Sequence, residues 1–269
     1  MKKAINLYVS NIDTMSKIDF IKDAGFDSIY TGIYNKPENI ELDEIINIFK
    51  SYGFDIPQMH CSYIEPKLKY IWEDGEVGQQ QIDNLLLQID QTAKYGIKNF
   101  VIHTNGEHNP PISKIGLERI RTLLERCKKY DINLCVENLY DYKQLKYIFD
   151  NIEDDNLKIC FDCGHHNCLT PNAPLTEELG HKIAVLHLHD NHGPIENGTG
   201  DEHLMVGQGE INLEKLASDI ALMNDDIVLC AEYKVAPEKC NKEYFYKAKE
   251  SLDKLEKLVL KYKNNYKEL

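Results

Sequence analysis

The chain has 269 residues, of which 42% are hydrophobic and 28% are charged, so it can bury the core of one large domain. Its formal net charge is −13, and an acidic surface repels phosphate backbones, which argues against a nucleic-acid partner. No apolar run reaches the roughly 18 residues that span a membrane. The lysine-containing start also lacks the long apolar segment of a secretory signal. We therefore expect a cytoplasmic protein with no membrane partner.

The expected oxidation state of the eight cysteines depends on this cytoplasmic location. A reducing cytosol keeps thiols free, and free cysteines are most often small buried hydrophobic residues. Cys160, Cys163 and Cys168 have the spacing C-x2-C-x4-C, which suggests a zinc site. However, no second cysteine pair at zinc-finger spacing accompanies them, and Cys160 lies inside an apolar run. The pattern therefore favours structural cysteines.

Apolar runs rich in strand-forming residues alternate with segments that have helical spacing. Strands are expected at residues 4–9, 28–33, just before 60, 99–103, 133–137, 158–161, 184–189 and 227–233. Helices are expected at residues 16–24, 42–52, 82–96, 120–127, 145–149, 213–223 and 248–259. No linker or low-complexity boundary divides the chain. The order predicts a single (β/α)8 TIM barrel over residues 1–269. An open doubly wound sheet is the alternative, but its glycine-rich dinucleotide loop does not follow the first strand.

Two longer connections interrupt this regular alternation. Residues 61–78 form an irregular stretch that contains the single tryptophan, Trp72, together with Tyr63. Long loops without their own secondary structure tend to be functional lids. Residues 190–209 form a second loop, which is rich in glycine and histidine. From the end of the K-I-C-F-D-C-G-H-H stretch at residues 158–166 to His181 the pattern is weak.

Ligand-type side chains recur where the strands end. Six apolar runs end in a histidine or an acidic residue, at His60, His103, Glu137, Asp162, His187 and Glu232. In a parallel barrel the carboxyl ends of the strands carry the chemistry. Three carboxylates and one imidazole, Glu137, Asp162, His187 and Glu232, suit a divalent ion such as Mn²⁺, Mg²⁺, Co²⁺ or Zn²⁺. The alternative is that these are ordinary surface polar groups.

These motifs resemble the xylose-isomerase-like barrel superfamily of sugar and sugar-phosphate isomerases and epimerases, with the endonuclease IV group as relatives. The resemblance covers nearly the whole chain. It rests on V-I-H at 101–103, V-E-N at 136–138, F-D-C-G-H at 161–165, H-L-H-D at 187–190, D-E-H at 201–203, G-Q-G-E-I at 207–211 and A-E-Y at 231–233. Carried over position by position, it implies that a divalent metal ion is held by Glu137, Asp162, His187 and Glu232.

The endonuclease IV relatives use three zinc ions. The resemblance therefore implies possible additional metal ligands at His60, His103, His165, Asp201 and His203, all of which are present. The surroundings depart from that group, because the first strand reads I-N-L-Y-V-S rather than its glycine-alanine-histidine opening. The sixth strand ends in D-C-G-H where a threonine-cysteine pair would stand. Together with the acidic charge, these departures favour the sugar branch, in which His60, His103 and His165 contact the substrate.

The resemblance implies a divalent-metal-dependent isomerase or epimerase that acts on a small sugar or sugar phosphate. Such an enzyme removes a proton next to a carbonyl, and the metal ion stabilises the resulting enediolate. Glu137 and Glu232 are the predicted catalytic residues, since a carboxylate can take the proton and return it. One carboxylate suits isomerisation and two suit epimerisation, so both reactions stay open. The alternatives are an endonuclease IV-like three-zinc phosphodiesterase acting on abasic DNA, and a barrel that binds sugar without converting it.

The remaining side chains are weaker candidates. Trp72 and Tyr63 would close over a sugar ring, or alternatively would anchor their own loop. His189 shares the face of His187 by strand alternation and would support it. The sequence leaves open which sugar is bound, whether it is phosphorylated, and the oligomeric state, a homo-oligomer included.

Overall fold

The computed structural model describes residues 1–7, 17–33, 41–62, 70–106, 110–194 and 200–267. Within these residues, parallel strands form an eight-stranded sheet in the order β7-β6-β5-β4-β3-β2-β1-β8. Their bounds are Lys3–Asn6 (β1), Ser28–Gly32 (β2), Met59–His60 (β3), Asn99–Ile102 (β4), Asn133–Glu137 (β5), Leu157–Asp162 (β6), Ile183–His187 (β7) and Leu229–Ala231 (β8). A parallel bridge between Leu188 and Ala231 joins the two ends of this order. The strands therefore form a nearly closed barrel.

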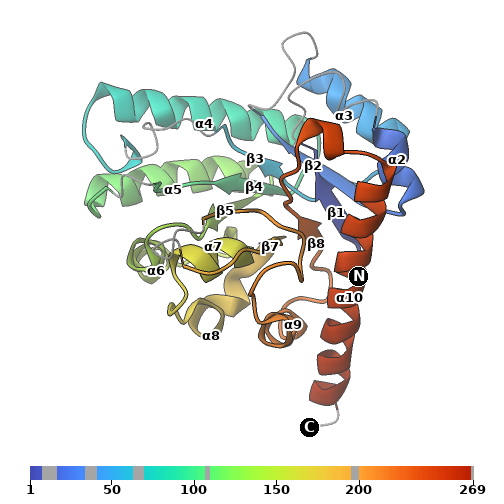
Figure 1. Ribbon diagram of the computed structural model, residues 1–269. Coiled ribbons are helices and arrows are strands. Elements are labelled where there is room, and N and C mark those ends of the chain that lie inside the picture. The colour runs from blue at the N-terminus through green and yellow to red at the C-terminus, as the bar shows by residue number, and fades with distance from the viewer. Residues whose placement is uncertain (8–16, 34–40, 63–69, 107–109, 195–199, 268–269) are drawn as a thin grey trace.

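Helices connect the strands and cover the outside of the barrel (Figure 1). Their bounds are Ile18–Asp23 (α2), Leu42–Ser51 (α3), Glu76–Lys94 (α4), Lys114–Lys129 (α5), Tyr142–Asn151 (α6), Cys163–Leu169 (α7), Leu175–Leu179 (α8), Leu213–Ala221 (α9) and Lys242–Lys267 (α10), with short 3-10 turns at Gly180–Lys182 (η2) and Pro237–Lys239 (η4). The helices α4 and α5 lie side by side on one flank, and α10 runs along the other beside α9. The predicted (β/α)8 barrel is confirmed. Among the described helices, none is both long enough and apolar enough to cross a membrane.

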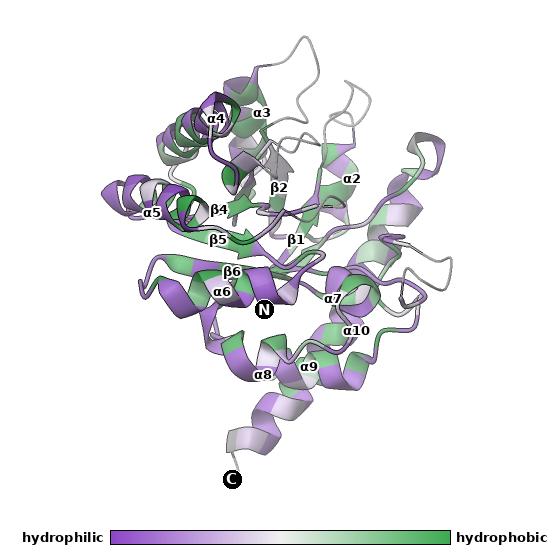
Figure 2. Cartoon of the chain, turned by 90° about the vertical axis from the view of Figure 1, so that its left-hand side faces the viewer, coloured by the Kyte–Doolittle hydropathy of each residue, from purple (hydrophilic) through white to green (hydrophobic). Residues whose placement is uncertain are grey.

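The apolar periodicity of the helices explains how they pack. In α3 the buried residues are Leu42, Ile45, Ile46 and Phe49, which form one face at helical spacing. Figure 2 shows the strands mostly in hydrophobic green and the outward faces of α4 and α5 in hydrophilic purple. Each fully buried side chain of this size contributes about 1.5–3 kcal/mol relative to an exposed one. Burial against the sheet thus holds the helices on the barrel.

Strand alternation divides the barrel interior into layers. Val101, Cys135, Cys160 and Val185 pack together as a buried cluster separate from the outer core. Successive residues of a strand face opposite sides, so the next inward-facing position lies two residues further along. Those positions are His103, Glu137, Asp162 and His187. An apolar plug therefore supports a layer of metal-ligand types at the carboxyl ends of the strands.

The structure differs from the expectation directly after β6. The short helix α7 begins at Cys163, where no helix was predicted. The side chain of Asp162 caps it by accepting a hydrogen bond from the backbone N–H of His165 at 2.7 Å. The segment lacks apolar periodicity because three of its residues, Gly164, His165 and His166, are glycine or histidine. The helix therefore depends on its cap and its packing.

Candidate metal centre

Four predicted ligands converge above the apolar plug. Glu137, Asp162, His187 and Glu232 are buried, and one ligand atom from each lies within 4.8 Å of the others. The Nδ1 atom of His187 is central, since it lies 2.8 Å from Oε2 of Glu232 and 3.5 Å from Oε2 of Glu137. It is also 3.9 Å from Oδ2 of Asp162. We call these four residues the first donor group.

Glu137 also contacts three further histidines. Its Oε2 lies 3.1 Å from Nε2 of His60 and 3.0 Å from Nε2 of His103. Its Oε1 lies 3.1 Å from Nδ1 of His165. The other ring nitrogen of His60 donates to the carbonyl of Cys61 at 3.0 Å, which directs Nε2 to the carboxylate. His60, Glu137 and His187 thereby form a group that overlaps the first.

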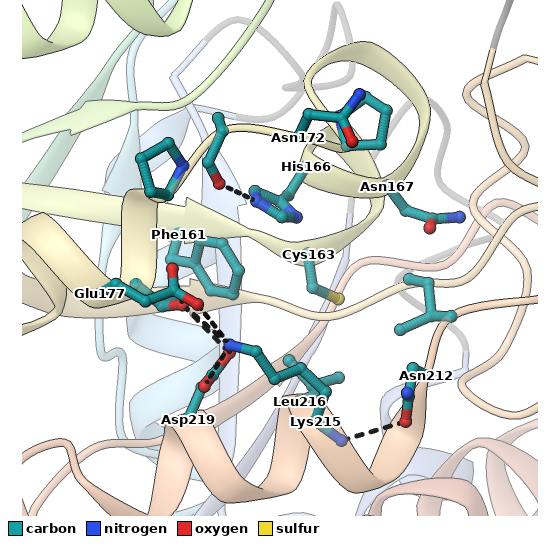
Figure 3. A pocket seen from close by; sticks show the side chains of 15 residues that line it. Phe161, Cys163, His166, Asn167, Asn172, Glu177, Asn212, Lys215, Leu216 and Asp219 are labelled. Atoms are coloured by element: carbon teal, nitrogen blue, oxygen red, sulfur yellow. Dashed lines mark hydrogen bonds and ion pairs between the residues drawn. The ribbon is translucent and has the colours of Figure 1, made fainter.

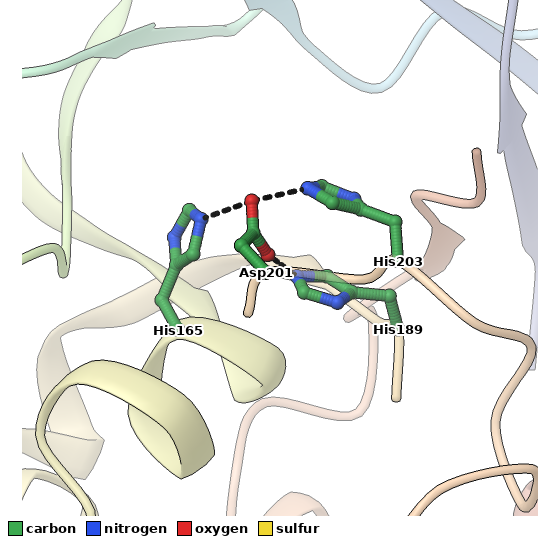
Figure 4. A group of neighbouring side chains, drawn as sticks. All are labelled: His165, His189, Asp201 and His203. Atoms are coloured by element: carbon green, nitrogen blue, oxygen red, sulfur yellow. Dashed lines mark hydrogen bonds and ion pairs between the residues drawn. The ribbon is translucent and has the colours of Figure 1, made fainter. Parts of the chain in front are cut away.

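A second donor group consists of His165, His189, Asp201 and His203. Figure 4 shows the three imidazoles arranged around the carboxylate of Asp201. Nε2 of His203 lies 2.8 Å from Oδ2 of Asp201, and the Nε2 atoms of His165 and His189 each lie 3.6 Å from one of its oxygens. The rings of His189 and His203 stack at 3.9 Å. Strand alternation suggested only that His189 faces the same way as His187, so its place in this group is new.

The loop that carries Asp201 and His203 is held in place. His203 has a positive φ of 51°, which is uncommon for a residue other than glycine. Its Nδ1 donates to the carbonyl of Glu232 at 2.7 Å. Leu204 and Asp190 are joined by two backbone hydrogen bonds of 2.9 Å. His203 is consequently buried.

The charges of the two groups compensate one another. Burial alone raises the pKa of Glu137, but His103 and His187 hold it well below its usual value. In the same way, His187 and His203 outweigh burial at Glu232 and lower its pKa. Burial lowers the pKa of His165, yet the nearby carboxylates of Asp162, Asp201 and Glu137 raise it well above normal. Glu137 and Glu232 are therefore ionised at neutral pH, which is the form that binds a cation.

The donor atoms fit a divalent metal ion. Among the described residues, the buried Nδ1 atom of His187 has no hydrogen-bond partner although it faces three carboxylates. A buried polar atom without a partner is rare in native proteins and points to a bound ligand or a functional role. Nitrogen and oxygen donors in this number suit Zn²⁺, Co²⁺ or Mn²⁺. Glu137, Asp162, His187 and Glu232 are thus suited to hold such an ion.

A cavity of about 380 Å³ opens directly above the donor groups. It is lined by His60, His103, Asn105, Gly106, Glu137, Leu139, Tyr140, His165, Leu169, Asp201, His203, Glu232 and Lys234. Its size is typical of a small-molecule site. Apolar side chains, including Leu139 and Leu169, form part of the wall. Lys234 is the one lysine or arginine among the described lining residues, and its Nζ lies 3.5 Å from Oδ2 of Asp201.

A second hollow of about 390 Å³ lies outside the barrel, between the α7–α8 segment and α9 (Figure 3). His166 faces this hollow, and its Nε2 donates to the carbonyl of Ala173 at 2.9 Å. Lys215 lies beside it, paired with Glu177 at 2.9 Å and Asp219 at 2.7 Å. The neighbouring residue His165 points into the barrel mouth instead. The side chains of these two adjacent histidines therefore line two different cavities.

Trp72 does not line the cavity, contrary to the prediction of a substrate contact. It is 2% exposed, and its indole Nε1 donates to the carbonyl of Thr104 at 2.7 Å. It packs against Gly116 of α5 so closely that a Cβ on this glycine would lie 2.1 Å from Cε3 of the indole. The indole therefore anchors its own segment in the core, which was the alternative interpretation. Tyr63 lies outside the described residues.

The fold and the donor groups together define a (β/α)8 barrel with a candidate metal centre at its carboxyl end. The chain belongs to the xylose isomerase-like TIM barrel family, whose model matches residues 18–258. This result confirms the superfamily predicted from the strand-end motifs.

Similarity to individual proteins extends over most of the chain. An uncharacterized protein of Methanocaldococcus jannaschii is 24% identical over 217 residues, which cover 72% of this chain and 82% of that protein. A D-tagatose 3-epimerase-like protein superposes with a TM-score of 0.76 at 21% identity, covering 97% of this chain and 99% of the other. The IolI protein with a bound zinc atom superposes with a TM-score of 0.77 at 18% identity, with the same coverage of 97% and 99%. These likenesses to solved structures establish the shared fold.

Proposed function

We propose that the protein is a divalent-metal-dependent isomerase or epimerase that acts on a small sugar or sugar phosphate. The observation that carries this proposal is the convergence of Glu137, Asp162, His187 and Glu232 at the floor of a cavity of about 380 Å³. The structural neighbours support it, because they include a protein named for its likeness to an epimerase and one with a bound zinc atom. A divalent ion in the first donor group would stabilise negative charge that develops on the substrate's oxygens.

Glu137 and Glu232 are proposed to move the proton. Both are buried, both line the cavity, and they flank Nδ1 of His187 at 3.5 Å and 2.8 Å. The lowered pKa of each keeps it ionised at neutral pH, and an ionised carboxylate is the form that accepts a proton. Because both carboxylates reach the same cavity, one-base isomerisation and two-base epimerisation both remain within the proposal.

The other lining residues are proposed to bind and orient the sugar. His60, His103 and His165 contact Glu137 and face the cavity, so their ring nitrogens are placed to bond substrate hydroxyls. The apolar wall at Leu139 and Leu169 suits the C–H face of a sugar. Lys234 is 60% exposed at its side chain, and its charge suits a phosphate at the rim.

The test combines metal content with hydrogen exchange at carbon. Protein purified without chelator is analysed for bound metal, then incubated in heavy water with a panel of ketoses and ketose phosphates. We expect deuterium to enter the carbon next to the carbonyl, and exchange to be lost in Glu232→Gln with folding retained. Absence of exchange and conversion across the panel, on metal-loaded protein, would contradict the proposal.

A second candidate function is phosphodiester hydrolysis at abasic DNA by a three-zinc centre. The observation that favours it is the second donor group, together with the overlapping His60–Glu137–His187 group, in one cavity. The acidic chain disfavours a DNA partner. Three zinc ions per chain, of which Asp201→Asn loses one, and cleavage of an abasic duplex would establish this candidate over the first.

A further inference from the structure

Gln58 and His187 meet across the interior of the barrel. Gln58 directly precedes β3, and His187 ends β7, which stands four places away in the eight-stranded order. Both side chains are fully buried, at 0% exposure. The amide Nε2 of Gln58 lies 2.9 Å from Nε2 of His187, and the amide Oε1 lies 3.1 Å from the same nitrogen. A polar contact thus spans the barrel directly beneath the first donor group.

The location of one proton decides whether His187 can bind a cation. A neutral imidazole carries its proton on one nitrogen and offers a lone pair on the other. Nδ1 is the nitrogen that faces Glu137, Asp162 and Glu232. It can ligate a cation only when the proton resides on Nε2. Something must therefore accept a hydrogen bond from Nε2.

We propose that Gln58 is a positioning residue that accepts the Nε2–H of His187 through Oε1 and so keeps Nδ1 bare for the cation of the first donor group. This inference rests on the metal site of the proposed function and is independent of the sugar chemistry. Either orientation of the amide places a suitable atom near Nε2, and the orientation with Oε1 as acceptor is the one that matches a bound cation.

Two rings cover the faces of His187, and Gln58 and the thiol of Cys160 also contact it. The ring of Tyr30 stacks on His187 at 5.6 Å with an interplanar angle of 10°, and the ring of His60 stacks at 5.8 Å and 22°. Tyr30 itself is fixed by its hydroxyl, which donates to the carbonyl of Ala231 at 3.1 Å. The two rings set the plane of His187, but they do not choose its tautomer. That choice requires a partner at the ring edge.

His187 differs in this respect from two histidines beside it. The outward nitrogens of His60 and His203 donate to the carbonyls of Cys61 and Glu232, at 3.0 Å and 2.7 Å. A backbone carbonyl is only an acceptor, so each of these tautomers is fixed by the main chain. The partner of His187 is a side chain, and a substitution can therefore remove it.

Two variants separate the acceptor from the bulk of the side chain. Gln58→Met keeps the length and removes the acceptor, whereas Gln58→Glu keeps the acceptor. We expect Gln58→Met to weaken Zn²⁺ binding by about 10–100-fold, the usual effect of losing such an outer partner. Gln58→Glu should bind Zn²⁺ within a few-fold of the parent. Gln88→Met is the matched control, because Gln88 is also buried but bonds the backbone N–H of Ser62 at 2.8 Å, away from the donor groups.

The affinity for Zn²⁺ is measured by chelator competition on the full chain, with Asp201→Asn present in every protein so that the second donor group is weakened. NMR of isotope-labelled histidine in the Zn²⁺-loaded parent then locates the His187 proton, with Nε2 expected. Unchanged affinity in Gln58→Met, equal weakening in both Gln58 variants, or a proton on Nδ1 would overturn the inference. If the predicted pattern appears but no ketose exchanges deuterium, the sugar proposal fails and the inference on Gln58 stands.

Discussion

Gly164 and His189 share a space that leaves no room for another carbon atom. A Cβ built on Gly164 would lie 1.9 Å from Cε1 of His189. The ring that this glycine admits belongs to the second donor group and also contacts the first. Its Nε2 is 2.9 Å from Oδ1 of Asp162 in the first group and 3.6 Å from Oδ1 of Asp201 in the second. The glycine in α7 therefore permits a direct link between the groups.

Gly164→Ala should displace the His189 ring, because a methyl group and the ring cannot occupy the same volume. We expect a loss of about 1–3 kcal/mol in the free energy of unfolding, as for other overpacked sites. The metal affinity of the second donor group should fall as well. Denaturant unfolding and metal content measure the two effects. Gly180→Ala is the control, since a Cβ there meets no atom within 4 Å. Equal stability of the two variants would show that His189 moves without cost.

Glu137→Gln should reduce the metal content more than Asp201→Asn does. Glu137 belongs to two of the overlapping groups, whereas Asp201 belongs only to the second. Each substitution replaces a carboxylate by an amide of the same shape, so the ligand charge is lost and the volume is kept. Metal content per chain after gel filtration gives the comparison, with unfolding curves to verify the fold. The reverse order of losses would contradict the first donor group as the principal site.

The Lys3–Glu256 pair should make stability depend on pH in the acidic range. Nζ of Lys3 lies 2.6 Å from Oε2 of Glu256, and the terminal ammonium contacts the same carboxylate. Burial raises the pKa of Glu256, but these two cations lower it below its usual value. Because the folded pKa lies below the unfolded one, the pair stabilises the fold above about pH 4.3 and this stability is lost as the pH falls further.

Glu256→Gln should therefore lower the free energy of unfolding by about 1 kcal/mol at neutral pH. The difference from the parent should shrink as the pH falls below about 4. Urea unfolding at several pH values measures it. Glu250→Gln is the control, because Glu250 pairs with Lys254 on the surface, where both side chains are well exposed. A difference that stays constant down to pH 3 would argue against the lowered pKa.

The fluorescence of Trp72 should depend on the packing of the core and should not change when a substrate binds. It is the single tryptophan of the chain, so its fluorescence is unambiguous. Its burial predicts blue-shifted emission with little quenching by acrylamide, unchanged when a ketose fills the cavity. Trp72→Phe leaves the carbonyl of Thr104 without its indole donor and should cost about 1–3 kcal/mol of stability. Quenching of the emission by a ketose would restore the predicted substrate contact.

The first donor group could be predicted from the sequence, because residues that end successive strands come together at one end of a barrel. Polar residues at the ends of four successive strands must meet at one mouth, whatever the loops do. Glu137, Asp162, His187 and Glu232 are such residues. No comparable rule covers Trp72, which lies in an irregular segment without a period. Its burial depends on the missing side chain at Gly116, and this complementarity is invisible in a single sequence.

Other features depend on contacts between distant segments. Gln58 and His187 are 129 residues apart, and nothing near Gln58 marks its partner. The helix α7 depends on a cap from Asp162, a residue that the sequence pattern assigned to metal binding. His189 joins the second donor group through the stacked ring of His203. Sequence periodicity describes single elements, so it places these residues without showing which of them meet.

The candidate metal centre lies at the place where β7 and β8 close the barrel. The two strands are joined where the N–H of Leu188 donates to the carbonyl of Cys230 at 2.8 Å and the N–H of Glu232 donates to the carbonyl of Leu188 at 3.0 Å. His187 and Glu232 stand on either side of this closure. A cation bound to both residues would link β7 to β8 where the barrel closes. Loss of either ligand from the cation would then be coupled to separation of these two strands.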